Sequence, residues 1–517
     1  MPTRYFLAKL AVLFLLLVPC GAEAADARPN IIIAVAENPA TLEPAQELSN
    51  VGTRITYNVY DTLIRRDFLA DGSGTAAVLA PHLAESWKRI PGNGLELVLR
   101  KGVRFHNGDE LTAEDAVFTF ARLLAPDTPL QEARAYFIGF ERLEAVSPYI
   151  MRIYTKNYDP LLEHRLSSWA SWIVNKKAYQ SMGMAAFSKK PVGTGPFKVK
   201  AVIPGERIEL ESFDDYFMGR PTAKNLTFTV VPEVAARMSG LVSGQFSMAV
   251  NIPPDQLDLL SSYPDIDVRS IVLANSHLLV FNTSHPILKD KRVRQALSLS
   301  IDRQALNKAL WHNKAVVPLN YQYPEFGPLY EPDRKGYVYD PEKASALLKE
   351  AGYKGETITY HTQSGYYLNS LAAAQIMLEM WKKAGINVDL KVIENWKQVR
   401  DEDIMIRNWS NSVRYPDPAG CLWMNWSPLS NPQRLWKTWD KESAAKFNAL
   451  GETLDRTADM KERKAVTQAL IDEWDDAAPA TILYQPLESY AVRKNIEWKP
   501  YSFYYMDFRP YNLRIGK

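Results

Sequence analysis

The sequence predicts an α/β protein with more than one domain, and three observations support this. The chain has 517 residues, of which 46% are hydrophobic and 23% charged, so it is long enough for two or three globular cores. Short runs of β-branched residues alternate along it with longer segments of helical periodicity. Two cysteines are too few for a disulfide-built scaffold, so stability must come from the burial of apolar surface.

The first residues of the chain are typical of a secretory signal at 1–24. Arg4 and Lys9 flank the start of an uncharged run at 10–18, and small residues follow at 22–25. The run is shorter than the roughly 20 apolar residues that span a bilayer, so an uncleaved anchor is the weaker alternative. We expect cleavage after Ala24 and no integral membrane span.

Cys20 lies inside this signal, in a context that faintly resembles a lipoprotein box. Pro19 directly precedes it and counts against lipid anchoring. Once the signal is removed, Cys421 is the single cysteine, and we interpret it as a buried structural thiol.

The next part of the chain alternates strands with helices. The predicted strands are 30–36, 95–100, 208–211 and 226–231, followed by an extended apolar run at 271–281. A capping box at 112–115 opens a helix that continues to Leu123, and Pro232 precedes a helix at 233–243.

From residue 290 the pattern shifts toward longer helices, which predicts a second α/β lobe. The helices are expected at 291–300, 302–311, 341–351, 368–384, 441–456 and 459–477, with a strand at 388–393. Gly352 and Gly385 are placed to end two of them. The terminal stretch 501–511 is aromatic, strand-like and too apolar for a free tail, so we expect it to pair back onto the first lobe.

The motifs of common enzymes are absent from the sequence. It contains no phosphate-binding glycine loop, nucleophile elbow or His-Glu-x-x-His zinc motif, and no two of its seven histidines lie three to five residues apart. The formal net charge of +2 gives no basic footprint for nucleic acid. We therefore expect a binding protein that is not an enzyme and has no cofactor, no metal site and no nucleic-acid partner.

A series of motifs closely resembles the bacterial extracellular solute-binding proteins of family 5, the peptide-type and nickel-type receptors of ABC importers. The motifs occur in order at 83–88, 95–109, 111–118, 191–197, 216–221, 281–283, 292–302, 339–344 and 415–418. We expect most of these segments to be scaffold. Gly193 and Gly195, for example, permit close approach of another element.

The resemblance implies a two-lobed α/β periplasmic-binding-protein fold of type II, cluster C, with an extra domain in lobe one and a two-strand hinge. Mapped onto this chain, lobe one takes 26–60, 186–275 and 486–517, the extra domain takes 61–185, and lobe two takes 276–485. The implied function is periplasmic capture of a small hydrophilic solute by a monomer for the permease subunits of an ABC importer. A secreted hydrolase and a periplasmic chaperone are the alternatives.

The resemblance also directs attention to Arg414. In peptide-binding relatives, an aspartate just before the Asp-Pro element anchors the α-amine of the peptide, and the residue aligned with it here is Arg414. A guanidinium suits a carboxylate or phosphate, so we expect an anionic ligand: an opine, a phosphorylated sugar conjugate or an acidic peptide. Alternatively, the alignment is off by a residue or two, or Arg414 pairs with Asp417 or Glu402.

Aromatic and polar residues near this element and near the crossover complete the predicted site. Aromatic side chains at this density provide stacking walls for a ligand or pack in the core. The candidate ligand-binding residues are Arg407, Trp409, Arg414, Tyr415, Asp417 and Trp423, then His361, Tyr366, Tyr367 and Trp396, and then Asn275, Ser276 and His277.

Overall fold

The computed structural model describes residues 26–336, 338–363 and 365–516. The predicted signal at 1–24, including Cys20, lies outside the described residues. Within the described ranges, no helix is both long and apolar enough to cross a membrane.

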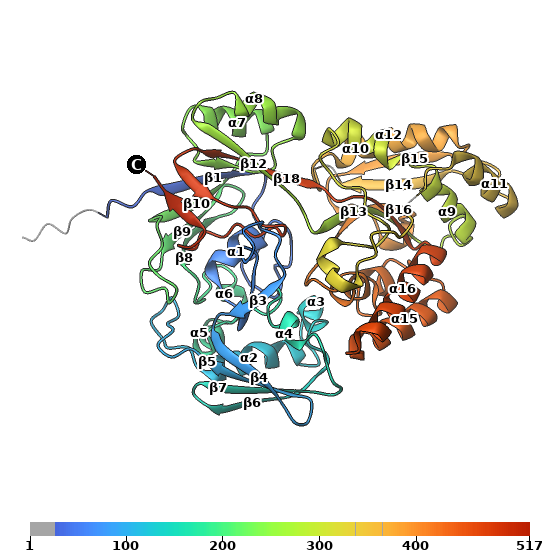
Figure 1. Cartoon of the computed structure of the whole chain (residues 1–517). Helices are drawn as coiled ribbons and strands as arrows, with labels where there is room; N and C mark the ends of the chain where they lie inside the picture. Colours follow the sequence, from blue (N-terminus) through green and yellow to red (C-terminus); the bar gives the residue numbers. More distant parts are fainter. Residues whose placement is uncertain (1–25, 337, 364, 517) are drawn as a thin grey trace, which may run out of the picture.

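The first lobe is built on a seven-stranded sheet that begins with the predicted apolar strand. Its order is β12-β18-β11-β1-β10-β9-β8, with β1 parallel to β10 and β11. Helices α7 (Val234–Val242) and α8 (Leu257–Ser261) lie at its β12 end (Figure 1). The strands are β1 (Asn30–Val35), β8 (Phe197–Ile203), β9 (Arg207–Ser212), β10 (Asn225–Val230), β11 (Met248–Ala249), β12 (Ile266–Val272) and β18 (Leu487–Arg493).

The second lobe is built on a five-stranded sheet of order β15-β14-β16-β13-β17. Strands β14 (Ile358–Gln363), β15 (Val388–Ile393) and β16 (Ile406–Ser412) are parallel to one another, whereas β13 (Asn275–Phe281) and β17 (Ala480–Tyr484) complete it in antiparallel pairs. Its helices are α9 (Lys291–Leu299), α10 (Arg303–Trp311), α11 (Pro341–Ala351), α12 (Ser370–Lys383), α13 (Leu422–Trp426), α14 (Asn431–Arg434), α15 (Lys441–Arg456) and α16 (Met460–Ala477).

Two crossings join the lobes, and one of them divides the predicted extended run at 271–281. Strand β12 ends at Val272 in the seven-stranded sheet, and β13 begins at Asn275 in the five-stranded sheet. The return crossing runs from β17 to β18, and the Leu273 N–H donates to the Pro486 carbonyl at 3.0 Å. The predicted two-strand connection is thus present (Figure 1). The bounds assigned to the individual domains stay a prediction.

A four-stranded sheet of order β4-β5-β7-β6 forms the lower part of the first lobe (Figure 1). The predicted capping box is formed: the Thr112 N–H donates to Asp115 at 3.0 Å and opens α2 (Ala113–Leu124). The remaining elements are α1 (Thr53–Val59), β2 (Ile64–Asp67), β3 (Val78–Pro81), β4 (Ala84–Ile90), β5 (Gly94–Leu99), α3 (Gln131–Arg134), β6 (Phe140–Ser147), β7 (Ile150–Thr155), α4 (Leu162–Arg165), α5 (Lys176–Met182) and α6 (Met184–Phe187).

Glycines before β8 allow it to approach α1, as the sequence predicts. A β-carbon at Gly193 would lie 2.1 Å from the Val59 carbonyl oxygen, and one at Gly195 would lie 2.5 Å from the Asn58 carbonyl oxygen. No side chain fits at these distances, so the two residues hold scaffold geometry.

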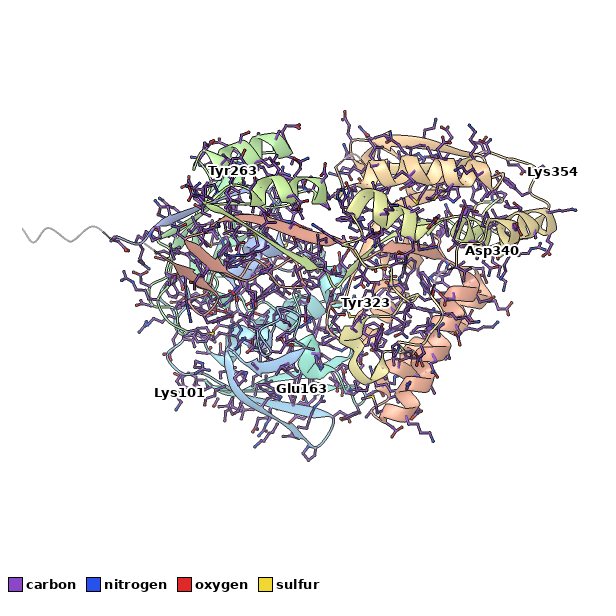
Figure 2. The ribbon with its side chains drawn as sticks, turned by 45° about the horizontal axis from the view of Figure 1, so that its top comes forward. Lys101, Glu163, Tyr263, Tyr323, Asp340 and Lys354 are labelled. Atoms are coloured by element: carbon purple, nitrogen blue, oxygen red, sulfur yellow. The ribbon has the colours of Figure 1, made fainter. Side chains whose placement is uncertain are left out.

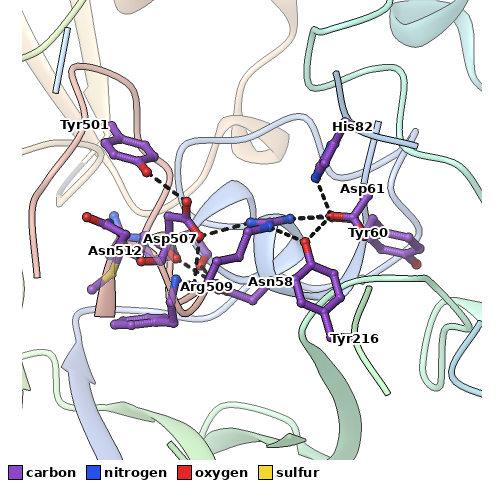
Figure 3. A network of polar contacts seen from close by, with 12 residues as sticks. Asn58, Tyr60, Asp61, His82, Tyr216, Tyr501, Asp507, Arg509 and Asn512 are labelled. Carbon is purple, nitrogen blue, oxygen red and sulfur yellow. Dashed lines mark hydrogen bonds and ion pairs between the residues drawn. The ribbon is translucent and has the colours of Figure 1, made fainter. Parts of the chain in front are cut away.

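The C-terminal stretch is buried on the first lobe, but the prediction of a strand at 501–511 is wrong. It runs as bends and irregular backbone, and side chains bond to part of that backbone in place of a strand ladder. The Asn58 amide donates to the Met506 carbonyl, and its oxygen accepts from the Phe508 N–H. Figure 3 shows Arg509 between Asp61 and Asp507 in this contact. A short antiparallel pair, β19 (Ile496–Trp498) with β20 (Leu513–Ile515), flanks this stretch on its two sides.

Large aromatic side chains are buried in the interior of the molecule. Tyr323 is fully buried near the middle of the molecule, whereas Lys101, Tyr263 and Lys354 lie at the periphery (Figure 2). Cys421 is also fully buried, and this burial raises the pKa of its thiol well above the ordinary value. The structure thus places Cys421 as a packed thiol, away from solvent.

Candidate functional site

A cavity of about 870 Å³ lies between the lobes, with walls from both. We call it the interlobe cavity. Six of the thirteen candidate residues line it, all from lobe two: Tyr366, Tyr367, Trp396, Arg407, Trp409 and Arg414. Lobe one contributes Glu37, Asn38, Pro39, Ala40, Glu47, Leu48, Ser49, Asn50, Val51, Glu132 and Trp169.

The lobe-two wall is assembled by the carboxyl ends of three parallel strands. Tyr366 lies three residues after β14, Trp396 three residues after β15, and Arg414 two residues after β16. Because parallel strands end at the same edge of a sheet, residues far apart in sequence come together there. This edge faces lobe one across the cavity.

Arg407 is held by its own lobe before any ligand enters. Its guanidinium pairs with Asp401 at 2.5 Å and lies over the rings of Trp396 and Trp436 at 4.9 and 4.4 Å. Burial lowers the pKa of Arg407 although Asp401 opposes that effect. Its charge is therefore largely neutralised, and the side chain stiffens the aromatic wall.

Arg414 is less completely neutralised. Its single ion pair within the described residues is a 3.7 Å contact to Glu132, whose side chain is 55% exposed, and its buried Nε has no partner. The guanidinium lies 5.2 Å from the ring centre of Tyr136. Burial acts to lower the pKa of Arg414, but Tyr136 and Glu132 outweigh it, so the group stays cationic. The alternative pairings with Asp417 and Glu402 are not formed, since these bind Arg463 and Arg400.

Glu47 is the counterpart on the lobe-one wall. It is 7% exposed, accepts a hydrogen bond from the Ser49 hydroxyl and has no ion pair with any described residue. Burial, the dominant cause, raises the pKa of Glu47 from 4.5 to about 7. This carboxyl therefore titrates near neutral pH inside the cavity.

We expect Glu47→Gln to be more stable than the wild type above pH 7 and similar to it near pH 4. The folded protein binds the Glu47 proton more tightly than the unfolded chain does. Protonation of Glu47 therefore stabilises the wild-type fold fully below pH 4.5, and this stabilisation is lost as pH rises through about 7, whereas the glutamine variant does not titrate. The difference at pH 8 should be on the order of 2–3 kcal/mol. Urea unfolding across this pH range measures it. Glu394→Gln, at an exposed position, is the control, and equal pH profiles for both variants would contradict the prediction.

A second cavity of about 340 Å³ continues toward the crossing strands. We call it the hinge cavity. It shares Glu37, Asn50, Val51 and 365–367 with the interlobe cavity, and Leu273 and Pro486 of the crossings also line it. His277 lines this cavity and stacks on Tyr367 with ring centres 3.6 Å apart. Burial lowers the pKa of His277 to about 3, so the ring is neutral.

Three candidates near the Asp-Pro element lie outside the two cavities. Tyr415 is buried under Arg165, with the guanidinium 5.7 Å from its ring centre. Asp417 accepts a hydrogen bond from the Arg463 guanidinium. The Trp423 indole donates to Asp455 at 3.3 Å beside a separate cavity of about 420 Å³. The sequence places them close to Arg414, but the chain turns inward after that residue.

Three further candidates are also outside the cavity walls. The Asn275 amide donates to Ser412 at 2.9 Å, and the Ser276 hydroxyl contacts Tyr323 at 2.6 Å. His361 is 8% exposed on β14, opposite Arg407 in the sheet register. Of these side chains, Asn275 links two neighbouring strands of the five-stranded sheet, β13 and β16.

Sequence reasoning missed the lobe-one wall. Glu37 lies two residues after β1, where a buried strand gives way to a loop, and Glu47 lies farther along the same connection, before α1. That position was a usable signal, because ligands gather at the carboxyl ends of parallel strands. Glu132 and Trp169 gave no comparable signal. Across the described ranges, no group of His, Cys, Asp and Glu side chains is arranged to hold a metal ion.

Comparisons with known proteins agree with this geometry. Residues 78–433 match the bacterial extracellular solute-binding proteins, family 5 Middle. The oligopeptide-binding protein AppA of Bacillus subtilis (strain 168) is 27% identical over 457 residues, which is 81% of this chain and 80% of that protein.

Solved structures show the same two-lobed fold. DppA from Helicobacter pylori in complex with the peptide STSA has a TM-score of 0.83 at 23% identity, covering 95% of this chain and 99% of that one. AgaA from A. tumefaciens R10 in complex with agropinic acid has a TM-score of 0.81 at 19% identity, covering 94% and 99%. The fold class expected from the sequence is thereby confirmed.

Proposed function

This chain belongs to the bacterial extracellular solute-binding proteins of family 5, and on that premise we propose that it captures a small hydrophilic solute in the periplasm for an ABC importer. The solute is bound in the interlobe cavity without chemical change, and the closed, loaded protein is presented to the permease subunits. We propose that it acts as a monomer with the domain bounds given above. The comparisons do not support the hydrolase or chaperone alternative.

The observation that carries the ligand class is the state of Arg414. It is a cationic arginine on the wall of an 870 Å³ cavity, with a side chain that is 10% exposed, one long ion pair and a buried, unpartnered Nε. Such a group is well suited to a carboxylate or phosphate. We propose a peptide or peptide-like solute, an opine or a phosphorylated sugar conjugate that carries at least one negative group.

A thermal-shift screen tests the function. The panel contains acidic and neutral di- and tripeptides, opines, sugar phosphates and nickel, each recovered after incubation. Stabilisation by one class of solute that is recovered unchanged supports the proposal. Formation of a product would favour the hydrolase, and stabilisation by many unfolded chains would favour the chaperone.

We expect Arg414→Ala to weaken binding of the stabilising solute at least about 30-fold. Loss of one partner from a buried charged contact costs about 2 kcal/mol or more, and each 1.4 kcal/mol is a tenfold change in affinity. Calorimetric titration measures the change. Arg400→Ala is the matched control, because Arg400 is 74% exposed and lies outside the cavity walls. Unchanged affinity in Arg414→Ala would remove the anion anchor from the proposal.

A further inference from the structure

The hinge cavity contains a buried arginine to which the proposed function assigns no role. Arg54 comes from α1, is 6% exposed and lines this cavity. Among the described residues, its side chain makes one hydrogen bond, a long contact of 3.4 Å from Nη1 to the Asn251 amide oxygen. Its Nε is buried and has no hydrogen-bond partner in the described chain. Buried guanidinium groups are normally satisfied, so Arg54 has donor capacity to spare.

The second arginine of the cavity shows the contrast. Arg237 donates to the carbonyls of Val231, Pro232, Val250 and Asn251 at 2.7–3.2 Å. All of its nitrogens are therefore engaged in holding the chain around α7. Arg237 is scaffold, whereas Arg54 is not saturated.

The acidic groups of the cavity do not occupy Arg54 either. Glu488 accepts three hydrogen bonds from Asn251 at 2.9–3.1 Å, and neither Glu488 nor Glu37 forms an ion pair with Arg54. Burial raises the pKa of both carboxyls although the nearby charge of Arg54 opposes that effect, so each is less readily ionised than usual. The positive charge of Arg54 is thus incompletely balanced by the protein.

The remaining walls fit an organic group beside that charge. Tyr367, Tyr504, Trp311 and the neutral His277 provide aromatic surface, and the volume of about 340 Å³ suits the end of a larger molecule. The wall residues at 365–367 are shared with the interlobe cavity, so the two cavities adjoin.

We propose that the hinge cavity is a carboxylate-binding subsite with Arg54 as its anchor. This proposal rests on the proposed function, because the carboxylate belongs to the solute captured between the lobes. A bound solute would then reach from Arg414 on lobe two to Arg54 on lobe one, and its carboxylate end would contact both crossing strands. An acidic peptide and a carboxylate-bearing opine share this chemistry.

The direct test uses sodium acetate as the probe, so it does not depend on knowing the solute. The protein is titrated with acetate while the ¹H–¹⁵N resonances of the arginine Nε groups are followed, and Arg54 is assigned by the signal missing in Arg54→Gln. We expect a saturable shift of the Arg54 resonance. The same shift in sodium chloride, or no shift in acetate, overturns the proposal. Thermal unfolding of Arg54→Gln and Arg54→Lys verifies that both variants fold.

A second test uses the stabilising member of the screen and its carboxamide. Arg54→Gln should weaken binding of the carboxylate form roughly tenfold to a hundredfold and leave the carboxamide unchanged, with partial recovery in Arg54→Lys. Equal loss for both forms, or no loss, contradicts the subsite. If no member of the panel binds the wild type, the proposed function fails, while the acetate titration still decides the role of Arg54.

Discussion

Replacing Arg509 with Met is expected to lower the free energy of unfolding by about 3–5 kcal/mol, because it leaves buried carboxylates without their cation. Arg509 is fully buried and binds Asp61 at 2.7 Å and Asp507 at 3.1 Å (Figure 3). It also donates to the Tyr216 hydroxyl at 2.8 Å. The network ties the C-terminal stretch to α1, so the loss should appear in the global unfolding transition.

Chemical denaturation followed by tryptophan fluorescence measures this loss. Arg514→Met is the matched control, since Arg514 lies in the same C-terminal stretch on β20 and is exposed. It should change the free energy of unfolding by less than about 0.5 kcal/mol. A denaturation curve of Arg509→Met that matches the wild type would show that the network does not stabilise the fold.

The second large effect on the free energy of unfolding is expected at Arg463, which forms an ion pair with Asp417. Arg463 binds Asp417 through two nitrogens, at 2.5 and 3.2 Å, and donates to the carbonyls of Leu454 and Thr457. Both members of the pair are buried. Arg463→Met should therefore lower the free energy of unfolding by about 3–5 kcal/mol, since it leaves the buried Asp417 carboxylate without its cation.

The same denaturation experiment tests this, with Arg456→Met as the control. Arg456 ends the neighbouring helix α15, is 58% exposed and contacts Glu452 at 3.9 Å, so little change is expected there. Equal stability of Arg463→Met and Arg456→Met would refute a structural role for the pair. It would return Asp417 to the group of candidate ligand contacts.

Much of the fold could be predicted because the relevant signals are local. The apolar run at the start of β1, the capping box of α2 and the glycine after α11 each lie within a few residues of the element they control. The C-terminal stretch shows the limit. Its aromatic composition predicted burial, but composition does not reveal that side chains such as Asn58 would replace a strand ladder.

The candidate site could be predicted only in part, for a related reason. Residues that follow the parallel strands, such as Tyr366, Trp396 and Arg414, share an edge that strand order creates. Asp417 and Trp423 are near Arg414 in sequence, yet the chain turns them into the lobe. Which of the thirteen residues contact a ligand stays a prediction.

The sequence by itself determined the class of the protein: an α/β chain that lacks the common enzyme motifs and has the ordered motifs of a solute-binding family. These features follow from composition, periodicity and local spacing. The tertiary structure alone decided how the charges are distributed in the cleft. Arg407 is neutralised by Asp401, whereas Arg414, Glu47 and Arg54 face cavities with few partners. Electrostatic pairing depends on distances between segments far apart in the chain, and only the folded protein sets those distances.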